Sequence, residues 1–147
     1  MSYSIDVNIL LYASDRSSEL HSAAIGFLAA RQEDPDILYL PWVVAMAYLR
    51  IATHSSIFAS PLRPEDAIAN LENLLNQPRT RPLSETDGFL RDYKAMTGEL
   101  VVRGNLVPDA HLATILRQHG VRTLYTHDAD FARFEFLDVR FPLRPDQ

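Results

Sequence analysis

The apolar and polar positions of this chain follow two different periods, which predicts short strands separated by helices. From Ser2 to Asp6 apolar and polar residues alternate, as in a half-buried strand. Ile37 to Leu40 is apolar throughout, as expected for a strand of a buried parallel sheet. A further strand is expected over Val121 to Thr126, and shorter ones near Leu83 and near Val139 to Phe141.

The segments between these strands carry apolar residues at helical spacing. The expected helices are His21 to Arg31, Trp42 to Thr53 after Pro41, Pro64 to Gln77, Thr86 to Val102, and a last one with Pro108 in its first turn and Gly120 at its end. A short apolar segment, Ile9 to Ala13, follows Asn8, which we expect to cap it. Strands that alternate with helices predict an α/β fold, here a single domain of residues 1–147 with a short, mostly parallel central sheet flanked by helices.

Three acidic residues stand where packing does not call for a charge. Asp109 shares one helical face with Leu112 and Leu116, and a carboxylate on an apolar face is unfavourable unless it is paired, hydrogen-bonded or bound to a metal. Asp6 ends the first strand, and Asp128 follows the strand expected before it. Ligands of open parallel sheets bind at that end of the strands. We therefore expect the three acids at one edge of the sheet.

Each acid also has a purely structural explanation. Asp109 could favour the start of its helix through the helix dipole, and Asp128 and Asp130 could form a turn before Phe131. If Asp109 and Asp128 converge with Asp6, a functional role becomes the better explanation of the three acids. Like charges repel unless a cation lies among them, so the cluster would need a bound cation. Ligands that are all oxygen favour Mg²⁺ or Mn²⁺ over zinc, and such a site suits hydrolysis of a phosphodiester by water.

Composition and net charge exclude several kinds of site and several classes of protein. The chain has 147 residues, no cysteine and a net charge of −5. The lack of cysteine excludes disulfides, thiolate nucleophiles and cysteine-ligated zinc. The negative charge argues against a protein that coats nucleic acid by bulk electrostatics. The N-terminus has no signal-peptide pattern, and no apolar run reaches the roughly 20 residues of a membrane span, so we expect a cytoplasmic protein without a membrane partner.

Four short segments together resemble the PIN-domain ribonucleases, in particular the toxin component of VapBC toxin–antitoxin pairs. They are Asp6-Val-Asn8-Ile-Leu-Leu-Tyr-Ala, Tyr48-Leu-Arg50-Ile-Ala-Thr53, Val107-Pro-Asp109-Ala-His-Leu-Ala and Thr126-His-Asp128-Ala-Asp130-Phe131. No single segment is specific, but the four occur in the family's order and cover nearly the whole chain. The resemblance implies a PIN-like domain and a metal-dependent endoribonuclease that hydrolyses RNA.

The same resemblance implies roles for individual residues. Asp6, Asp109 and Asp128 would be the catalytic and metal-binding acids. The hydrogen bonds of Asn8 and Thr126 would orient them, and the supporting acid would be Asp130. The cofactor would be Mg²⁺, for which Mn²⁺ could substitute. The implied partners are an RNA substrate and a cognate VapB-type antitoxin, and we expect the protein itself to be a homodimer.

The chain departs from the family at one position. Ala47 stands where the family usually carries a glutamate, directly before the aromatic residue of the second motif. A missing carboxylate should weaken metal binding. It therefore keeps open an alternative from another class, a PIN-like module that binds RNA or a partner with weak cleavage or none.

Other activities fit less well. A phosphatase of the haloacid-dehalogenase type would need Asp-x-Asp after the first strand, where this chain has Asp6-Val-Asn8, and a dehydrogenase would need a G-x-G-x-x-G turn. The sequence does not name the RNA. Arginines that could contact its backbone are Arg50, Arg79, Arg81 and Arg103, although each could equally be a solvated surface residue, and Arg50 could stabilise a helix end.

Overall fold

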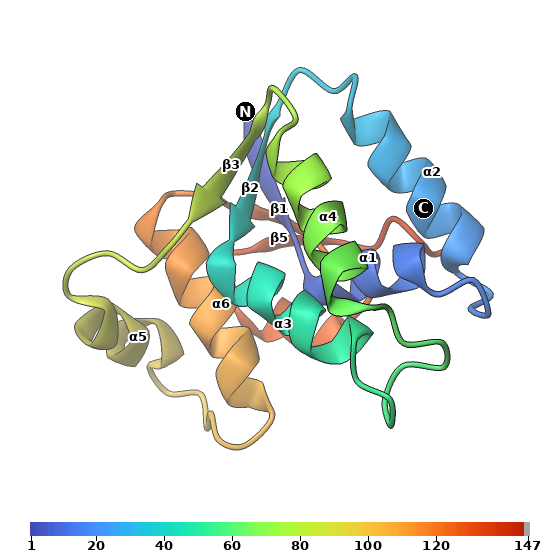
Figure 1. Cartoon of the computed structure of the whole chain (residues 1–147). Helices are drawn as coiled ribbons and strands as arrows, with labels where there is room; N and C mark the ends of the chain where they lie inside the picture. The colour runs from blue at the N-terminus through green and yellow to red at the C-terminus, as the bar shows by residue number, and fades with distance from the viewer. Residues whose placement is uncertain (146–147) are drawn as a thin grey trace.

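Five parallel strands form one central sheet in residues 1–145, the part of the chain that the computed structural model describes (Figure 1). The strands are β1 (Ser2–Ile5), β2 (Ile37–Pro41), β3 (Thr80–Leu83), β4 (Thr123–Tyr125) and β5 (Asp138–Arg140). Their order across the sheet is β3-β2-β1-β4-β5, and every neighbouring pair is parallel. The expected α/β fold with a mostly parallel central sheet is confirmed, while the domain boundary at 1–147 stays a prediction.

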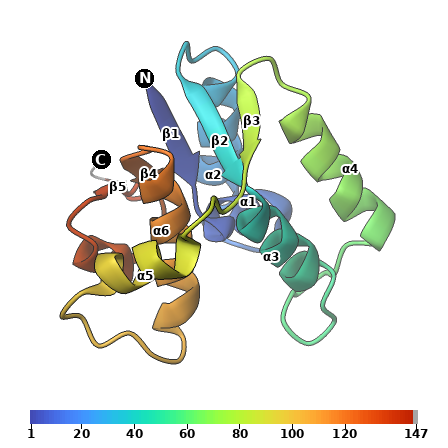
Figure 2. The ribbon, with the colours of Figure 1, turned by 90° about the vertical axis from the view of Figure 1, so that its left-hand side faces the viewer.

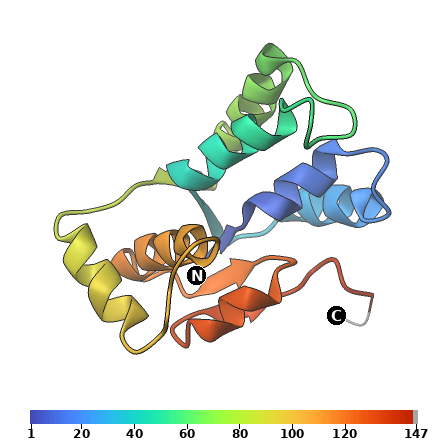
Figure 3. The same cartoon turned by 90° about the horizontal axis from the view of Figure 1, so that it is seen from below.

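Helices connect the strands and cover both faces of the sheet. They are α1 (Val7–Ser14), α2 (His21–Arg31), α3 (Trp42–Ala52), α4 (Pro64–Leu75), α5 (Phe89–Thr97), α6 (Leu106–Gln118) and the 3-10 helix η1 (Ala129–Arg133). The first four lie on one face, whereas α5 and α6 lie on the other, as right-handed crossovers require for this strand order (Figures 1 and 3). Within residues 1–145 no helix is both long enough and apolar enough to cross a membrane.

The direction of the chain across the sheet reverses between β1 and β4. From β1 the chain moves outward to β2 and then β3, whereas β4 leads to β5 on the opposite side. Such a reversal opens a crevice at the carboxyl ends of β1 and β4, where ligands of α/β proteins bind. Figure 3 looks from below onto this end of the sheet, with α3 and α6 on opposite sides of it.

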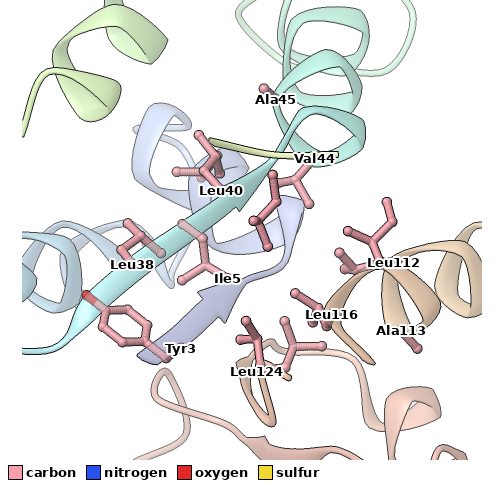
Figure 4. Packing of buried hydrophobic residues seen from close by; sticks show 14 of the residues in the cluster. Tyr3, Ile5, Leu38, Leu40, Val44, Ala45, Leu112, Ala113, Leu116 and Leu124 are labelled. Carbon is pink, nitrogen blue, oxygen red and sulfur yellow. The ribbon is translucent and has the colours of Figure 1, made fainter. Parts of the chain in front are cut away.

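The core lies where β1, β2 and β4 meet α3 and α6 (Figure 4). Ile5, Leu40 and Leu124 of the strands and Leu116 of α6 are completely buried. Burial of one such side chain contributes roughly 1.5–3 kcal/mol. This shared apolar layer determines where α6 lies on the sheet, and with it the position of Asp109 in the first turn of that helix.

One expected helix is much shorter than the sequence pattern suggested. The segment Thr86 to Val102 forms a helix only over Phe89–Thr97. Gly88 and Gly98 flank it with φ angles of 77° and 46°. Glycine adopts these conformations without strain, and they interrupt the helical hydrogen bonds on both sides. The longer prediction was wrong because the apolar spacing alone hides these two breaks.

The expected cap of α1 was also wrong. Asp6, and not Asn8, is the N-cap, because its side chain accepts a hydrogen bond from the backbone N–H of Val7. Asn8 lies one residue inside the helix start and uses its side chain elsewhere. The strand expected over Val121 to Thr126 is likewise shorter, since only Thr123–Tyr125 pairs with its neighbours.

Candidate active site

Asp6 is held in place by hydrogen bonds on both carboxylate oxygens. Its backbone N–H donates to the carbonyl of Tyr125 at 2.9 Å, which ties the end of β1 to the end of β4. Its Oδ1 accepts from the N–H of Val7 at 2.7 Å. Its Oδ2 accepts from the hydroxyl of Thr126 at 2.9 Å and from the amide of Asn8 at 3.2 Å. The carboxylate is therefore fixed at the crevice between the ends of β1 and β4.

Thr126 connects this carboxylate to the segment that carries Asp128. Its buried hydroxyl donates to Asp6 and accepts from the backbone N–H of Asp128 at 3.0 Å and from the Asn8 amide at 3.2 Å. Asn8 in turn accepts from the N–H of His127 at 3.2 Å. Thr126 and Asn8 thus link two segments that lie far apart in the sequence, which is the geometry expected of residues that orient neighbouring acids.

Three carboxylates converge beside this network. Asp109 from the first turn of α6, Asp128 after β4 and Asp130 in η1 each offer one oxygen, and these atoms lie within 4.8 Å of one another. Asp128 also caps η1, because its Oδ1 accepts from the N–H of Asp130 at 2.9 Å. We refer to Asp109, Asp128 and Asp130 as the acid cluster. Asp6 lies outside this closest set, with its oxygens already engaged by the network described above.

Burial and neighbouring charges disfavour the ionised forms of Asp109 and Asp6. Burial raises the pKa of Asp109 to about 7 from its usual 3.8, and the charges of Asp128, Asp6 and Asp130 add to that effect. Burial also raises the pKa of Asp6, against the opposing hydrogen bonds from Thr126 and Val7, and Asp128 raises it further. A divalent cation among these oxygens would remove the repulsion. Carboxylate oxygens in this arrangement fit a hard cation such as Mg²⁺.

A pocket of about 140 Å³ lies beside the acids, between α1, α3 and α6. Asp6 and Asp109 line it on one side, and Ala47 and Arg50 of α3 line it on the other. The position where the family usually carries a glutamate therefore faces the acidic pocket, and here it contributes only a methyl group. Arg50 lies where it could meet an anionic ligand.

The remaining candidate arginines lie elsewhere. Arg103 is exposed in the loop before α6 and does not line the pocket. Arg79 precedes β3, at the opposite end of the sheet, and donates to the backbone carbonyls of Asp34 and Gln32. Arg81 donates to the carbonyls of Pro78 and Thr80. Contacts with the protein's own backbone are therefore a sufficient explanation for Arg79 and Arg81.

Two residues near the acids were not anticipated from the sequence. The Arg133 guanidinium lies 3.9 Å from the Asp130 carboxylate, a pair whose spacing of three residues was a usable signal. The ring of His127 packs edge-on against Tyr12, with 5.7 Å between the ring centroids. No sequence pattern indicates that contact, because Tyr12 and His127 come from opposite ends of the chain.

Comparison with known proteins agrees with this geometry. Residues 3–137 match the PIN domain. The chain belongs to the PIN-domain family. This PIN domain is 39% identical to Ribonuclease VapC48 of Mycobacterium tuberculosis over 142 residues, which are 97% of this chain and 98% of the relative. It is 32% identical to Ribonuclease VapC37 of the same organism over 131 residues, 89% of this chain and 90% of the relative. The resemblance inferred from the four motifs is confirmed.

Solved structures share the fold of this PIN domain. Mycobacterium tuberculosis VapC20, a sarcin-ricin loop cleaving toxin, superposes with a TM-score of 0.69 at 17% identity, over 95% of this chain and 98% of that chain. VapBC-1 from nontypeable Haemophilus influenzae superposes with a TM-score of 0.66 at 19% identity, over 98% of this chain and 100% of that chain. At such low identity the likeness concerns the fold, so the activity of this chain has to be argued from its own residues.

Proposed function

We propose that this chain is a metal-dependent endoribonuclease, the VapC-type toxin of a type II toxin–antitoxin pair. The observation that carries the proposal is the acid cluster, three carboxylates with oxygens within 4.8 Å of one another beside the carboxyl ends of β1 and β4. Relatives named ribonucleases, up to 39% identical over almost the full length, support the same activity.

The residues present fit Mg²⁺ or Mn²⁺. Asp109, Asp128 and Asp130 would hold the ion, with Asp6 contributing directly or through a water molecule. When bound, a divalent ion supplies an activated water and neutralises charge on the scissile phosphate. Asp109 would then be ionised at neutral pH, because an adjacent cation lowers the pKa of a carboxyl group. We assign the catalytic role to Asp6, Asp109 and Asp128, and a supporting role to Asp130.

Thr126 and Asn8 act as positioning residues in this proposal. Their hydrogen bonds hold Asp6 and the backbone of Asp128 in a fixed relation, so the acids need little rearrangement when the metal binds. Arg50, which lines the pocket with Asp6 and Asp109, would contact a phosphate of the bound RNA.

The second candidate function is an RNA- or partner-binding module without cleavage. Ala47 favours it, because the wall of the pocket formed by α3 lacks the usual carboxylate. With one acid fewer, the site carries less negative charge and should bind a divalent ion more weakly. If the ligand of that module is RNA, the two candidates differ in catalysis alone, since both then predict that RNA is bound at the same pocket.

The proposed partners follow from the proposed class. We expect a cognate antitoxin that covers the acidic pocket, as VapC proteins occur in VapBC pairs such as the Haemophilus influenzae structure. We also expect a homodimer, and a cytoplasmic location, where an RNA substrate would be met.

RNA cleavage by three proteins side by side separates the two functions. The given chain, Ala47→Glu and Asp6→Asn are compared with Mg²⁺, with Mn²⁺ and with chelator. Cleavage by the given chain that requires metal and disappears in Asp6→Asn supports the nuclease. Cleavage by Ala47→Glu alone makes the given chain an inactive form. If all three bind RNA and none cleaves it, the binding module is the better account.

A further inference from the structure

The pocket between α1, α3 and α6 is bordered by apolar side chains over most of its surface. Of the residues that line it, only Asp6, Asp109 and Arg50 carry a charge. Figure 2 shows α6 and α3 on either side of the lower ends of β1 and β2, the region from which the lining residues come. A pocket that adjoins catalytic acids but has an apolar wall needs an explanation beyond metal binding.

The apolar wall suits a nucleobase better than a phosphate. A phosphate carries negative charge, and burying it against carbon atoms without partners is unfavourable. A base has two apolar ring faces, and its polar groups lie along its edges. Val43 and Ile51 of α3 and Leu112 of α6 line the pocket from two sides, so a flat ring between these helices would contact carbon atoms on both faces. The lining therefore favours a base as the occupant.

The pocket lies within reach of a phosphate held at the acid cluster. Asp109 belongs both to the cluster and to the lining of the pocket, and Asp6 lines it as well. In RNA each base is joined to its phosphate through a single ribose. A base next to the scissile phosphate can therefore enter the pocket while the phosphate stays at the acids. Arg50, which is exposed and lines the same pocket, can contact a phosphate outside it.

Ala47 leaves room for such a base. It lines the pocket with a methyl group, at the position where the family usually carries a glutamate. The longer side chain of a glutamate would extend into the same space and would place a charge among apolar side chains. The chain therefore has volume at this position where the family usually has a carboxylate.

The volume of the pocket limits the size of the base. The pocket measures about 140 Å³. An apolar cavity of about 150 Å³ accepts benzene, which is a single six-membered ring. Cytosine and uracil contain one ring of that size, whereas adenine and guanine carry a second ring fused to it. The pocket therefore favours a pyrimidine over a purine.

We propose that this pocket binds the base of a pyrimidine nucleotide next to the scissile phosphate, and that Ala47 provides the space for it. The proposal rests on the RNA-cleaving function argued above and adds a preference for sequence to it. Because Asp6 and Asp109 line the pocket, its occupant must also fit beside the acids. This favours RNA over an apolar side chain of a protein partner, which brings no phosphate to the acids.

The test measures binding of fluorescein-labelled hexanucleotides by anisotropy in the presence of Mg²⁺. One strand contains only uridine, one only adenosine, and one has abasic sugars with the same phosphates, so electrostatic attraction to the backbone is matched. All proteins, including the parent, carry Asp128→Asn, which removes an acid that does not line the pocket, and a gel checks that the RNA stays intact. The parent should bind the uridine strand roughly 5- to 150-fold more tightly than the abasic strand, the range that stacking of one base contributes.

Ala47→Leu fills the pocket with an apolar side chain and changes no charge. It should abolish the advantage of the uridine strand over the abasic strand and leave binding of the abasic strand as in the parent. The matched control is Ala23→Leu, because Ala23 is exposed on α2 and does not line the pocket. This control should bind all three strands like the parent.

Val43→Ala tests the size argument in the opposite direction. Val43 is half-buried and lines the pocket, so its truncation enlarges the space. Binding of the adenosine strand should then rise several-fold relative to the uridine strand, whereas Ala23→Leu should leave that ratio unchanged. Thermal melting shows which variants are folded, and Val43→Ala keeps the proposal open to refutation if Ala47→Leu does not fold.

Equal binding of the uridine and abasic strands by the parent would overturn the proposal and leave the nuclease function intact, since phosphates alone would then hold the RNA. A uridine advantage that persists in Ala47→Leu would also overturn it, because the base would lie elsewhere. Loss of antitoxin binding in Ala47→Leu, with RNA binding unchanged, would assign the pocket to the protein partner. If the parent binds none of the three strands, the proposed function itself is wrong.

Discussion

The hydroxyl of Thr126 donates a 2.9 Å hydrogen bond to Asp6, across 120 residues of sequence. This bond joins the chain ends leaving β1 and β4, the two strands between which the sheet reverses direction. The same hydroxyl accepts from the backbone N–H of Asp128. One buried side chain therefore sets the distance between an acid of the first strand and an acid of the fourth, and its removal should affect both stability and catalysis.

Thr126→Val tests that linkage, because valine has nearly the shape of threonine without the hydroxyl. Asp6 would lose one donor, and the partly buried N–H of Asp128 would lose its acceptor. Leaving buried polar groups unpaired costs about 1–3 kcal/mol each, so the free energy of unfolding should fall by an amount in that range. Urea unfolding measures it, and Thr126→Ser should restore most of the loss. Equal stability of Thr126→Val and the parent would mean that the network does not hold the acids.

The position of the acids at one edge of the sheet could be predicted from the sequence, for a physical reason. The period of two in Ser2–Ile5 and the helical period around Asp109 each assign a residue to a face, and parallel strands bring their carboxyl ends to one edge. Asp6 and Asp128 could therefore be placed near each other without a structure.

Details that depend on local backbone geometry could not be predicted in this way. Asp130 joins Asp109 and Asp128 in the closest set because η1 turns it back toward them, and no hydrophobic period indicates that turn. Asp6 rather than Asn8 caps α1 because the helix starts two residues earlier than the apolar segment suggested. Arg117 of α6 and Arg122, directly before β4, lie over the ring of Phe136 only because the segment before β5 packs against both.

Asp109 should make the stability of the metal-free protein depend on pH. Its pKa in the folded protein is about 7, above its usual 3.8, so the folded state binds more protons between these values than the unfolded state. Its contribution to stability is fully present below pH 4 and is lost as the pH rises through 7. In chelator, Asp109→Asn should therefore be more stable than the parent at pH 8, and this advantage should shrink at pH 5. Thermal melting at the two pH values measures the difference. An advantage that does not change with pH would contradict the raised pKa.

Added metal should offset the stability that the metal-free protein loses when Asp109 ionises. A ligand that binds only the folded state at 100 times its dissociation constant stabilises a protein by about 2.7 kcal/mol. At about 2–4 °C per kcal/mol for a chain of this size, Mg²⁺ or Mn²⁺ should raise the melting temperature by roughly 5–10 °C. Asp128→Asn should respond much less, whereas Asp36→Asn, at the start of β2 and thus the opposite end of the sheet, should respond like the parent. If neither Mg²⁺ nor Mn²⁺ changes the melting temperature of the parent, the proposed metal site is wrong.

Measuring RNA hydrolysis as a function of metal concentration tests whether the acid cluster binds the metal that the proposed nuclease activity needs. The parent is compared with Asp109→Asn, Asp128→Asn and Asp130→Asn, and with Asp36→Asn as the matched control. If the cluster binds the catalytic metal, each of the three variants should need about tenfold more Mg²⁺ or Mn²⁺ for half-maximal cleavage, or should lose cleavage altogether, since even outer partners of metal ligands change affinity by that much. The control should cleave like the parent. Cleavage with the same metal dependence in all five proteins would contradict the assignment of the acid cluster as the metal-dependent nuclease centre.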